Sequence, residues 1–90
     1  MPYRLSISRQ VHRHIDRLPG NVRQRVRRTI AQLALDPRPE DAKEMVDDLT
    51  GFYRLRVDVY RIIYTIDEDE VLVEVIRVAQ RTSSTYEGLV

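Results

Sequence analysis

Hydrophobic and polar residues alternate over residues 52–64, and this pattern predicts a β-hairpin. Two alternating runs meet at Asp58 and Val59, and a two-residue loop there places Arg56 opposite Arg61. One face of the hairpin is then apolar or aromatic, formed by Leu55, Val57, Tyr60, Ile62 and Tyr64. The opposite face gathers three guanidinium groups beside one apolar side chain: Arg54, Arg56, Arg61 and Ile63.

The first half of the chain predicts one strand followed by two helices. Residues 3–7 alternate as a short strand, and Ser8 can cap a helix that begins at Arg9. Asn21 and Gln24 have the spacing of a capping box for a second helix. The apolar stripes of the two helices follow helical spacing: Val11, Ile15 and Leu18, then Val22, Val26, Ile30 and Leu33. The short connection between them predicts an antiparallel helical hairpin.

The remaining segments complete the expected order. Residues 36–50 contain two prolines and many acids, and we expect a loop with a short helical turn over residues 42–46. Residues 67–70 form a tight turn, and the nearly continuous apolar run 71–78 predicts an interior strand. The predicted fold is therefore α+β, in the order β-α-α-β-β-β, with an antiparallel sheet and an N-terminal helical hairpin packed on one face. Residues 1–90 form a single domain.

Composition excludes several function classes. The chain has no cysteine, which leaves no disulfide and no thiolate chemistry, and the two histidines, His12 and His14, lie on different sides of a helix without nearby acids. We therefore expect no metal and no other cofactor. No window is apolar enough for a membrane span or a signal peptide, so we expect a cytoplasmic protein without a membrane partner.

Charge is segregated along the chain despite a formal net charge of +1. Residues 1–30 hold eight arginines and a single acid, Asp16, whereas residues 36–50 are mainly acidic. Like charges directly across a strand pair are destabilising, so Arg56 opposite Arg61 indicates an anionic ligand. A phosphodiester is the obvious candidate, and no small-molecule ligand is indicated.

Several motifs together resemble the RelE/ParE superfamily of toxins from toxin–antitoxin pairs. The resemblance covers residues 3–86 and rests on the element order and on five segments: residues 18–23, 33–39, 53–57, 60–64 and 75–81. It implies an antitoxin as partner and one of two activities. RelE-like members cut mRNA on the ribosome, whereas ParE-like members poison DNA gyrase.

The RelE branch implies particular site residues in this chain. The matching positions are Arg54, Arg56, Arg61, Arg81 and Tyr86. In metal-free RNA cleavage the 2′-OH attacks the adjacent phosphorus, and arginine suits the negative charge that develops on the phosphoryl oxygens. We assign Arg56 and Arg61 to the phosphate and Arg81 to the departing 5′-oxygen.

Two further roles complete this assignment. Tyr86 would stack on a base or orient the 2′-OH, and Arg54 would bind substrate. Arginine stays protonated, so the proton acceptor is open among Glu44, Asp58, Tyr86, a ribosomal group, or no strong base at all.

Structural roles remain alternatives for several of these residues. A two-residue turn at Glu68 and Asp69 would place Glu74 opposite Ile63, within reach of Arg61, and would turn Arg81 to the other face unless the chain bends. The tyrosines Tyr53, Tyr60 and Tyr64 are expected to pack in or against the core. A ParE-like gyrase inhibitor and an inactive antitoxin-binding homologue are the alternative functions.

Overall fold

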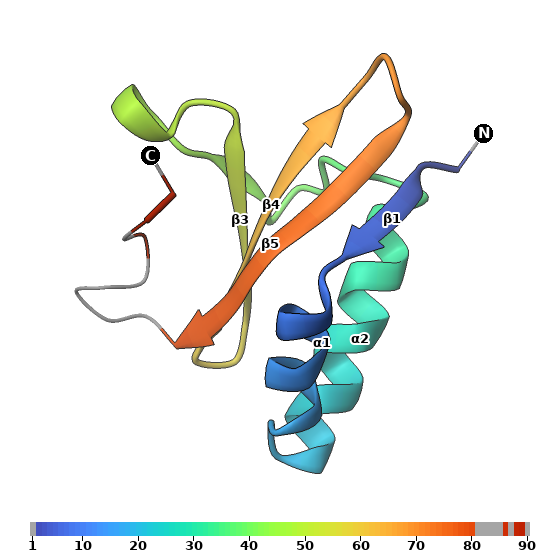
Figure 1. The fold of residues 1–90 in the computed structure, drawn as a ribbon, viewed down its shortest axis with the longest axis vertical. Helices are drawn as coiled ribbons and strands as arrows, with labels where there is room; N and C mark the ends of the chain where they lie inside the picture. Colours follow the sequence, from blue (N-terminus) through green and yellow to red (C-terminus); the bar gives the residue numbers. More distant parts are fainter. Residues whose placement is uncertain (1, 81–85, 87, 90) are drawn as a thin grey trace.

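The computed structural model describes residues 2–80, 86, 88 and 89. Its elements are β1 (Arg4–Ile7), α1 (Arg9–Asp16), α2 (Gly20–Leu33), β2 (Lys43–Glu44), a 3₁₀ turn (Asp47–Leu49), β3 (Phe52–Val57), β4 (Tyr60–Asp67) and β5 (Leu72–Gln80). The strands form one sheet in the order β1-β5-β4-β3-β2 (Figure 1). The predicted α+β fold is confirmed, and the sheet has in addition the short strand β2 and a parallel pairing of β1 with β5.

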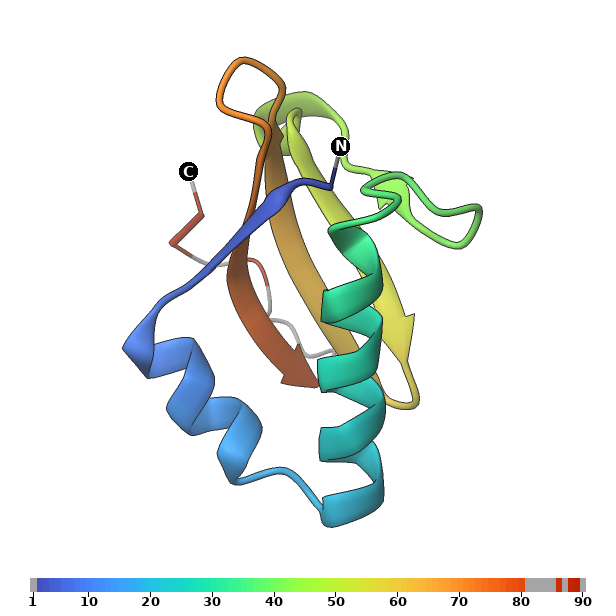
Figure 2. The same cartoon turned by 90° about the vertical axis from the view of Figure 1, so that its right-hand side faces the viewer.

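Both helices lie on the same side of the sheet (Figures 1 and 2). The predicted helical stripes are buried there against the apolar face of the hairpin, and Val26, Ile62, Tyr64 and Val73 are fully buried. Burying a Val, Leu or Ile side chain contributes about 1.5–3 kcal/mol, so this helix–sheet layer is a major source of stability. None of the described helices is long and apolar enough to cross a bilayer.

The helix starts differ in how they are capped. The Ser8 hydroxyl accepts a hydrogen bond from the Val11 amide at 3.1 Å, as predicted. The capping box at Asn21 is wrong: α2 begins at Gly20 after Pro19, and no side chain caps it. Pro19 has φ −52°, close to the value that its ring imposes, and its carbonyl accepts the first helical hydrogen bond from Arg23.

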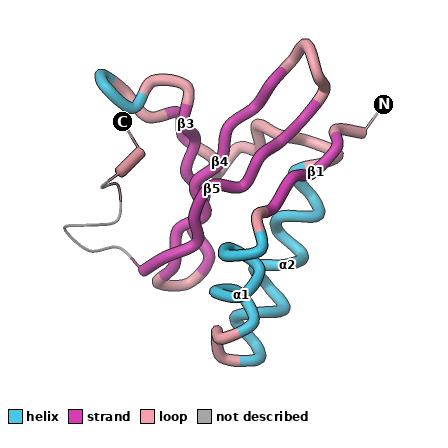
Figure 3. The backbone as a smooth tube through the Cα atoms, viewed as in Figure 1, coloured by secondary structure: helices cyan, strands magenta, loops and turns pink. Residues whose placement is uncertain are grey.

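The segment between α2 and β3 is more ordered than predicted. The helical turn expected over residues 42–46 is wrong, because Lys43 and Glu44 form β2 against β3 and the 3₁₀ turn follows at Asp47. The Met45 amide donates to the Phe52 carbonyl at 2.8 Å and fastens β2 to the sheet. The secondary-structure trace shows this segment as loop and turn along most of its length (Figure 3).

Candidate nucleic-acid interface

The β3–β4 hairpin has the predicted register. Val57 lies opposite Tyr60, Arg56 opposite Arg61, and Arg54 opposite Ile63. Because opposite residues share a face, Arg54, Arg56 and Arg61 lie on the side of the sheet away from both helices. We call this side the open face.

Arg61 is the one described charged residue that is buried, with 7% of its surface exposed. Its neighbour on the open face, Ile63, is fully buried but does not belong to the helix-side core. A buried charge is tolerated only when other groups offset its lost hydration. Its low exposure means that Arg61 has less room to move than a solvated arginine.

A hollow of about 440 Å³ opens directly over the paired arginines. It is lined by Arg56, Val59, Arg61 and Gln80, which come from β3, the hairpin loop, β4 and the end of β5. Arg56 is exposed, so the hollow is lined by one buried cation, Arg61, and one cation in contact with solvent. Two guanidinium groups around one concavity can bind the oxygens of a phosphate from two sides.

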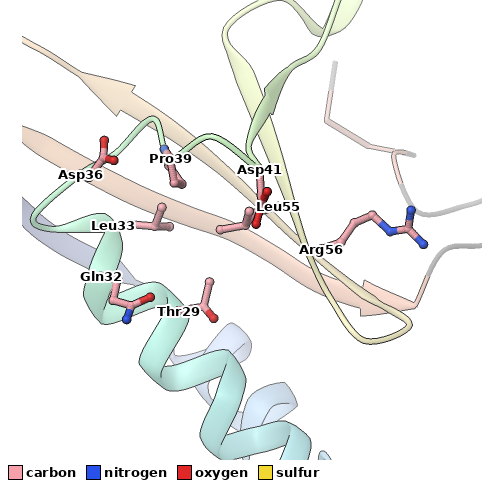
Figure 4. A pocket seen from close by; sticks show the side chains of 8 residues that line it. All are labelled: Thr29, Gln32, Leu33, Asp36, Pro39, Asp41, Leu55 and Arg56. Carbon is pink, nitrogen blue, oxygen red and sulfur yellow. The ribbon is translucent and has the colours of Figure 1, made fainter.

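A second cavity, of about 300 Å³, lies between α2 and the edge of β3 (Figure 4). Arg56 contributes to its lining, but the Arg56 side chain points away from the other side chains of that cavity (Figure 4). The guanidinium group thus belongs to the open face, and the α2 cavity is not part of the cationic site.

The hairpin loop is fixed by Asp58. This residue has φ 59°, a left-handed conformation that aspartate tolerates better than most residues. Its carboxylate lies 3.9 Å from the Arg25 guanidinium of α2. The Asp58 side chain is therefore directed toward the helix side of the sheet. Asp58 is therefore engaged in tethering the loop rather than facing the hollow.

Glu44 and Glu74 do not join the arginine pair. Glu44 lies opposite Tyr53 and accepts a hydrogen bond from its hydroxyl at 3.3 Å, on the helix side of the sheet. Glu74 lies opposite Thr65, so the predicted placement opposite Ile63 is wrong. The physical reason is the turn, which spans residues 68–71 instead of two residues and shifts the β4–β5 register.

Sequence reasoning missed two cations of the open face, Lys43 and Arg77. Lys43 lies opposite Arg54 because β2 pairs there, and Arg77 lies opposite Ile63 because β5 has a bulge at this point. A two-residue strand has too few positions to show a period, and the bulge is hidden in a continuous apolar run. The open face therefore carries more positive charge than the sequence pattern predicts.

Of the two predicted site residues near the C-terminus, Arg81 and Tyr86, the structure describes one. Arg81 lies outside the described residues; Gln80, directly before it, lines the hollow, and Ala79 lies opposite Arg61. The predicted register that turned Arg81 away does not hold. Tyr86 is described and half-buried. A Cβ built on Gly88 would lie 3.7 Å from Nη2 of Arg77, which places this part of the tail against the open face.

A polar network braces the opposite end of the sheet. Arg38 donates to Glu68 at 2.7 Å and to the Tyr53 hydroxyl at 3.2 Å, and the Tyr3 hydroxyl donates to Glu68 at 2.7 Å. The hydrogen bond from Tyr3, with that from Arg38, lowers the pKa of Glu68, and the same bond raises the pKa of Tyr3. This network joins β1, the loop after α2 and the β4–β5 turn.

The tyrosines next to this network have structural roles, as predicted. Tyr53 and Tyr64 stack with ring centroids 5.5 Å apart. The Tyr64 hydroxyl donates to the Pro37 carbonyl at 2.8 Å, and burial raises the pKa of Tyr64 well above its usual value. Tyr60 lies at the other end of β4, beside the hairpin loop, where it is partly buried against the core.

Residues 5–84 match the family model described as the ParE toxin of the type II toxin–antitoxin system parDE. The chain belongs to the RelE/ParE family of type II toxins. It is 29% identical over 83 residues to Toxin RelE of Mycobacterium tuberculosis, an alignment that covers 92% of this chain and 86% of that toxin.

Two solved structures of RelE-type toxins have the same fold. The toxin–antitoxin complex RelBE2 of M. tuberculosis matches with a TM-score of 0.77 and 26% identity, covering 90% of this chain and 100% of the matched chain. The archaeal RelE–RelB complex of Pyrococcus horikoshii matches with a TM-score of 0.75 and 26% identity, covering 92% and 99%. Membership of the family therefore rests on sequence and fold together.

Proposed function

We propose that this RelE/ParE toxin is a ribosome-dependent endoribonuclease that cleaves mRNA by metal-free attack of the 2′-OH. The observation that carries the proposal is the opposed pair Arg56 and Arg61, lining one hollow on the open face. Two like charges across a strand pair reduce stability unless an anion lies between them. A phosphate of RNA is an anion of the right size and geometry for two guanidinium groups.

In the proposed reaction the 2′-oxygen forms a bond to phosphorus while the bond to the 5′-oxygen breaks, which leaves a 2′,3′-cyclic phosphate and a 5′-oxygen that takes a proton from water to become the 5′-hydroxyl. Arg61 and Arg56 bind the non-bridging oxygens, whose negative charge increases in the transition state. Arg81 stabilises the departing 5′-oxygen, and Tyr86 stacks on a base or orients the 2′-OH. Arg54 binds substrate next to them.

The proton acceptor for the 2′-OH is not one of the acids considered for this role. Asp58 is directed toward Arg25, and Glu44 lies on the helix side with Tyr53. We infer that Tyr86 or a ribosomal group takes the proton, and that orientation and charge stabilisation provide most of the rate enhancement. The described residues contain no cluster of three or more His, Cys, Asp or Glu suited to a metal ion.

A cognate antitoxin is the second proposed partner. The RelE-type relatives above were solved as complexes with antitoxins. The exposed arginines of α1 and α2 provide a basic surface for an acidic partner segment or for ribosomal RNA phosphates, and the two uses would exclude each other. We propose that the antitoxin contacts this basic surface and also covers the open face, on the other side of the sheet, in a cytoplasmic complex.

The second candidate is inhibition of DNA gyrase, favoured by the ParE family model that spans residues 5–84. Expression of the toxin in cells, followed by mapping of mRNA ends and measurement of plasmid supercoiling, separates the two. We expect new mRNA ends within translated regions and normal supercoiling. Intact mRNA with relaxed plasmid DNA would assign the toxin to gyrase, and growth without either change would indicate an inactive antitoxin-binding homologue.

A further inference from the structure

Lys43 is the single lysine of the chain, and the structure brings it onto the open face. It lies opposite Arg54, just as Arg61 lies opposite Arg56. Each of the two arginines that β3 places on the open face therefore has a like charge opposite it: Arg54 faces β2 and Arg56 faces β4. Within the described part of the chain, neither Lys43 nor Arg54 has an ion pair with an acidic side chain.

The orientation of Lys43 is fixed by its neighbours in β2. Glu44 is held on the helix side by the Tyr53 hydroxyl, and side chains alternate along a strand, so Lys43 is directed to the other side. The nearby acid Asp41 lines the cavity beside α2. Glu44 and Asp41, the acids closest to Lys43 in the sequence, thus lie away from the open face.

The two cation pairs form two rows across the sheet. Arg54 and Arg56 are two residues apart on β3, so their rows are separated by about 6.8 Å along the strand. A single-stranded nucleic acid that runs parallel to β3 presents one phosphate to each row in turn. Each phosphate then binds the two cations of one row. The repulsion between like charges is relieved in both rows.

We propose that Lys43, together with Arg54, binds the mRNA phosphate adjacent to the one that is cut. Lys43 is thus a substrate-positioning residue that holds the RNA in register over the Arg56–Arg61 hollow. The inference rests on the proposed nuclease function and adds the direction of the RNA path, along β3 from the Arg56–Arg61 hollow to the row of Lys43 and Arg54.

The test uses purified ribosomes that carry a defined mRNA in which one phosphate beside the cleavage site is replaced by a neutral methylphosphonate, on the 5′ or the 3′ side in turn. Cleavage is followed under single turnover, and the toxin concentration for half-maximal rate is measured. For the unmodified toxin, neutralising one of the two neighbouring phosphates should raise this concentration about three- to tenfold. Lys43→Gln should raise it by a smaller factor on natural mRNA, and the neutral linkage should cost this variant less than it costs the unmodified toxin, because only the Arg54 contact is left to lose.

Lys43→Arg keeps the cation and should behave like the unmodified toxin, which separates charge from folding. Arg28→Gln, on an exposed position of α2, is the matched control and should leave the effect of the neutral linkage unchanged. Cleavage that responds additively to Lys43→Gln and to both neutral linkages would overturn the role of Lys43 while leaving the nuclease intact. Absence of cleavage by the unmodified toxin would overturn the nuclease function, and the role of Lys43 with it.

Discussion

Arg56 and Arg61 lie directly opposite each other on β3 and β4, and Arg61 is 7% exposed whereas Arg56 is open to solvent. The pair lines a hollow on the side of the sheet away from the helices. The two like charges lie opposite each other across the strand pair, and a bound phosphate would relieve their repulsion.

Replacing Arg56 by Gln should make the protein more stable and less active. Loss of the like charge opposite Arg61 is expected to raise the free energy of unfolding by about 0.2–1 kcal/mol. Urea denaturation at low ionic strength measures this gain, and added salt should reduce it because salt screens the repulsion. A decrease in stability would show that Arg56 has a favourable contact in the free protein.

Replacing Arg61 by Lys should lower the cleavage rate about 10²- to 10³-fold at saturating substrate, because one rigid donor to the transition state is lost while the charge remains. The circular dichroism spectrum should be unchanged. A variant that cuts mRNA at the original rate would remove Arg61 from the phosphate site.

Much of this site follows from the local sequence, since alternation over residues 52–64 and a two-residue loop allow only one register for the hairpin. The Arg56–Arg61 pair and the apolar opposite face were therefore predictable. The place of Lys43 on the open face was not predictable, because a strand of two residues is too short to show an alternating pattern. The predicted β4–β5 register was also wrong. Val71 belongs to a four-residue turn, where it adopts φ 52°, although its apolar side chain continues the sequence pattern of β5.

Stability should fall at acid pH through Glu68. Hydrogen bonds from Tyr3 and Arg38 lower its folded-state pKa below the usual 4.5, so the unfolded state binds the proton more readily. The contribution is complete above pH 4.5 and is lost as pH falls through the folded pKa. Urea titrations between neutral and acid pH should show a smaller decline for Glu68→Gln.

Asp69→Asn is the matched control for Glu68→Gln. Asp69 lies in the same turn and makes no hydrogen bond or ion pair with other described residues. This variant should retain the decline of the parent protein. An identical decline in Glu68→Gln would mean that the Tyr3–Glu68–Arg38 network contributes nothing to acid unfolding.

Tyr64→Phe should separate stability from activity. The variant leaves the Pro37 carbonyl without its hydrogen bond, and we expect the free energy of unfolding to fall by about 1 kcal/mol. Cleavage under conditions where the protein is folded should be unchanged, because Tyr64 lies on the helix side. A selective loss of cleavage would place this tyrosine in the chemistry.

The central claim is tested most directly by mixing purified ribosomes, a defined mRNA and the toxin, and mapping the RNA ends by primer extension. We predict cuts that require ribosomes, disappear with Arg61→Ala and persist with Arg4→Ala, an exposed arginine of β1 that pairs with Glu70. Intact mRNA with a folded toxin, or equal cutting by Arg61→Ala, would contradict the account.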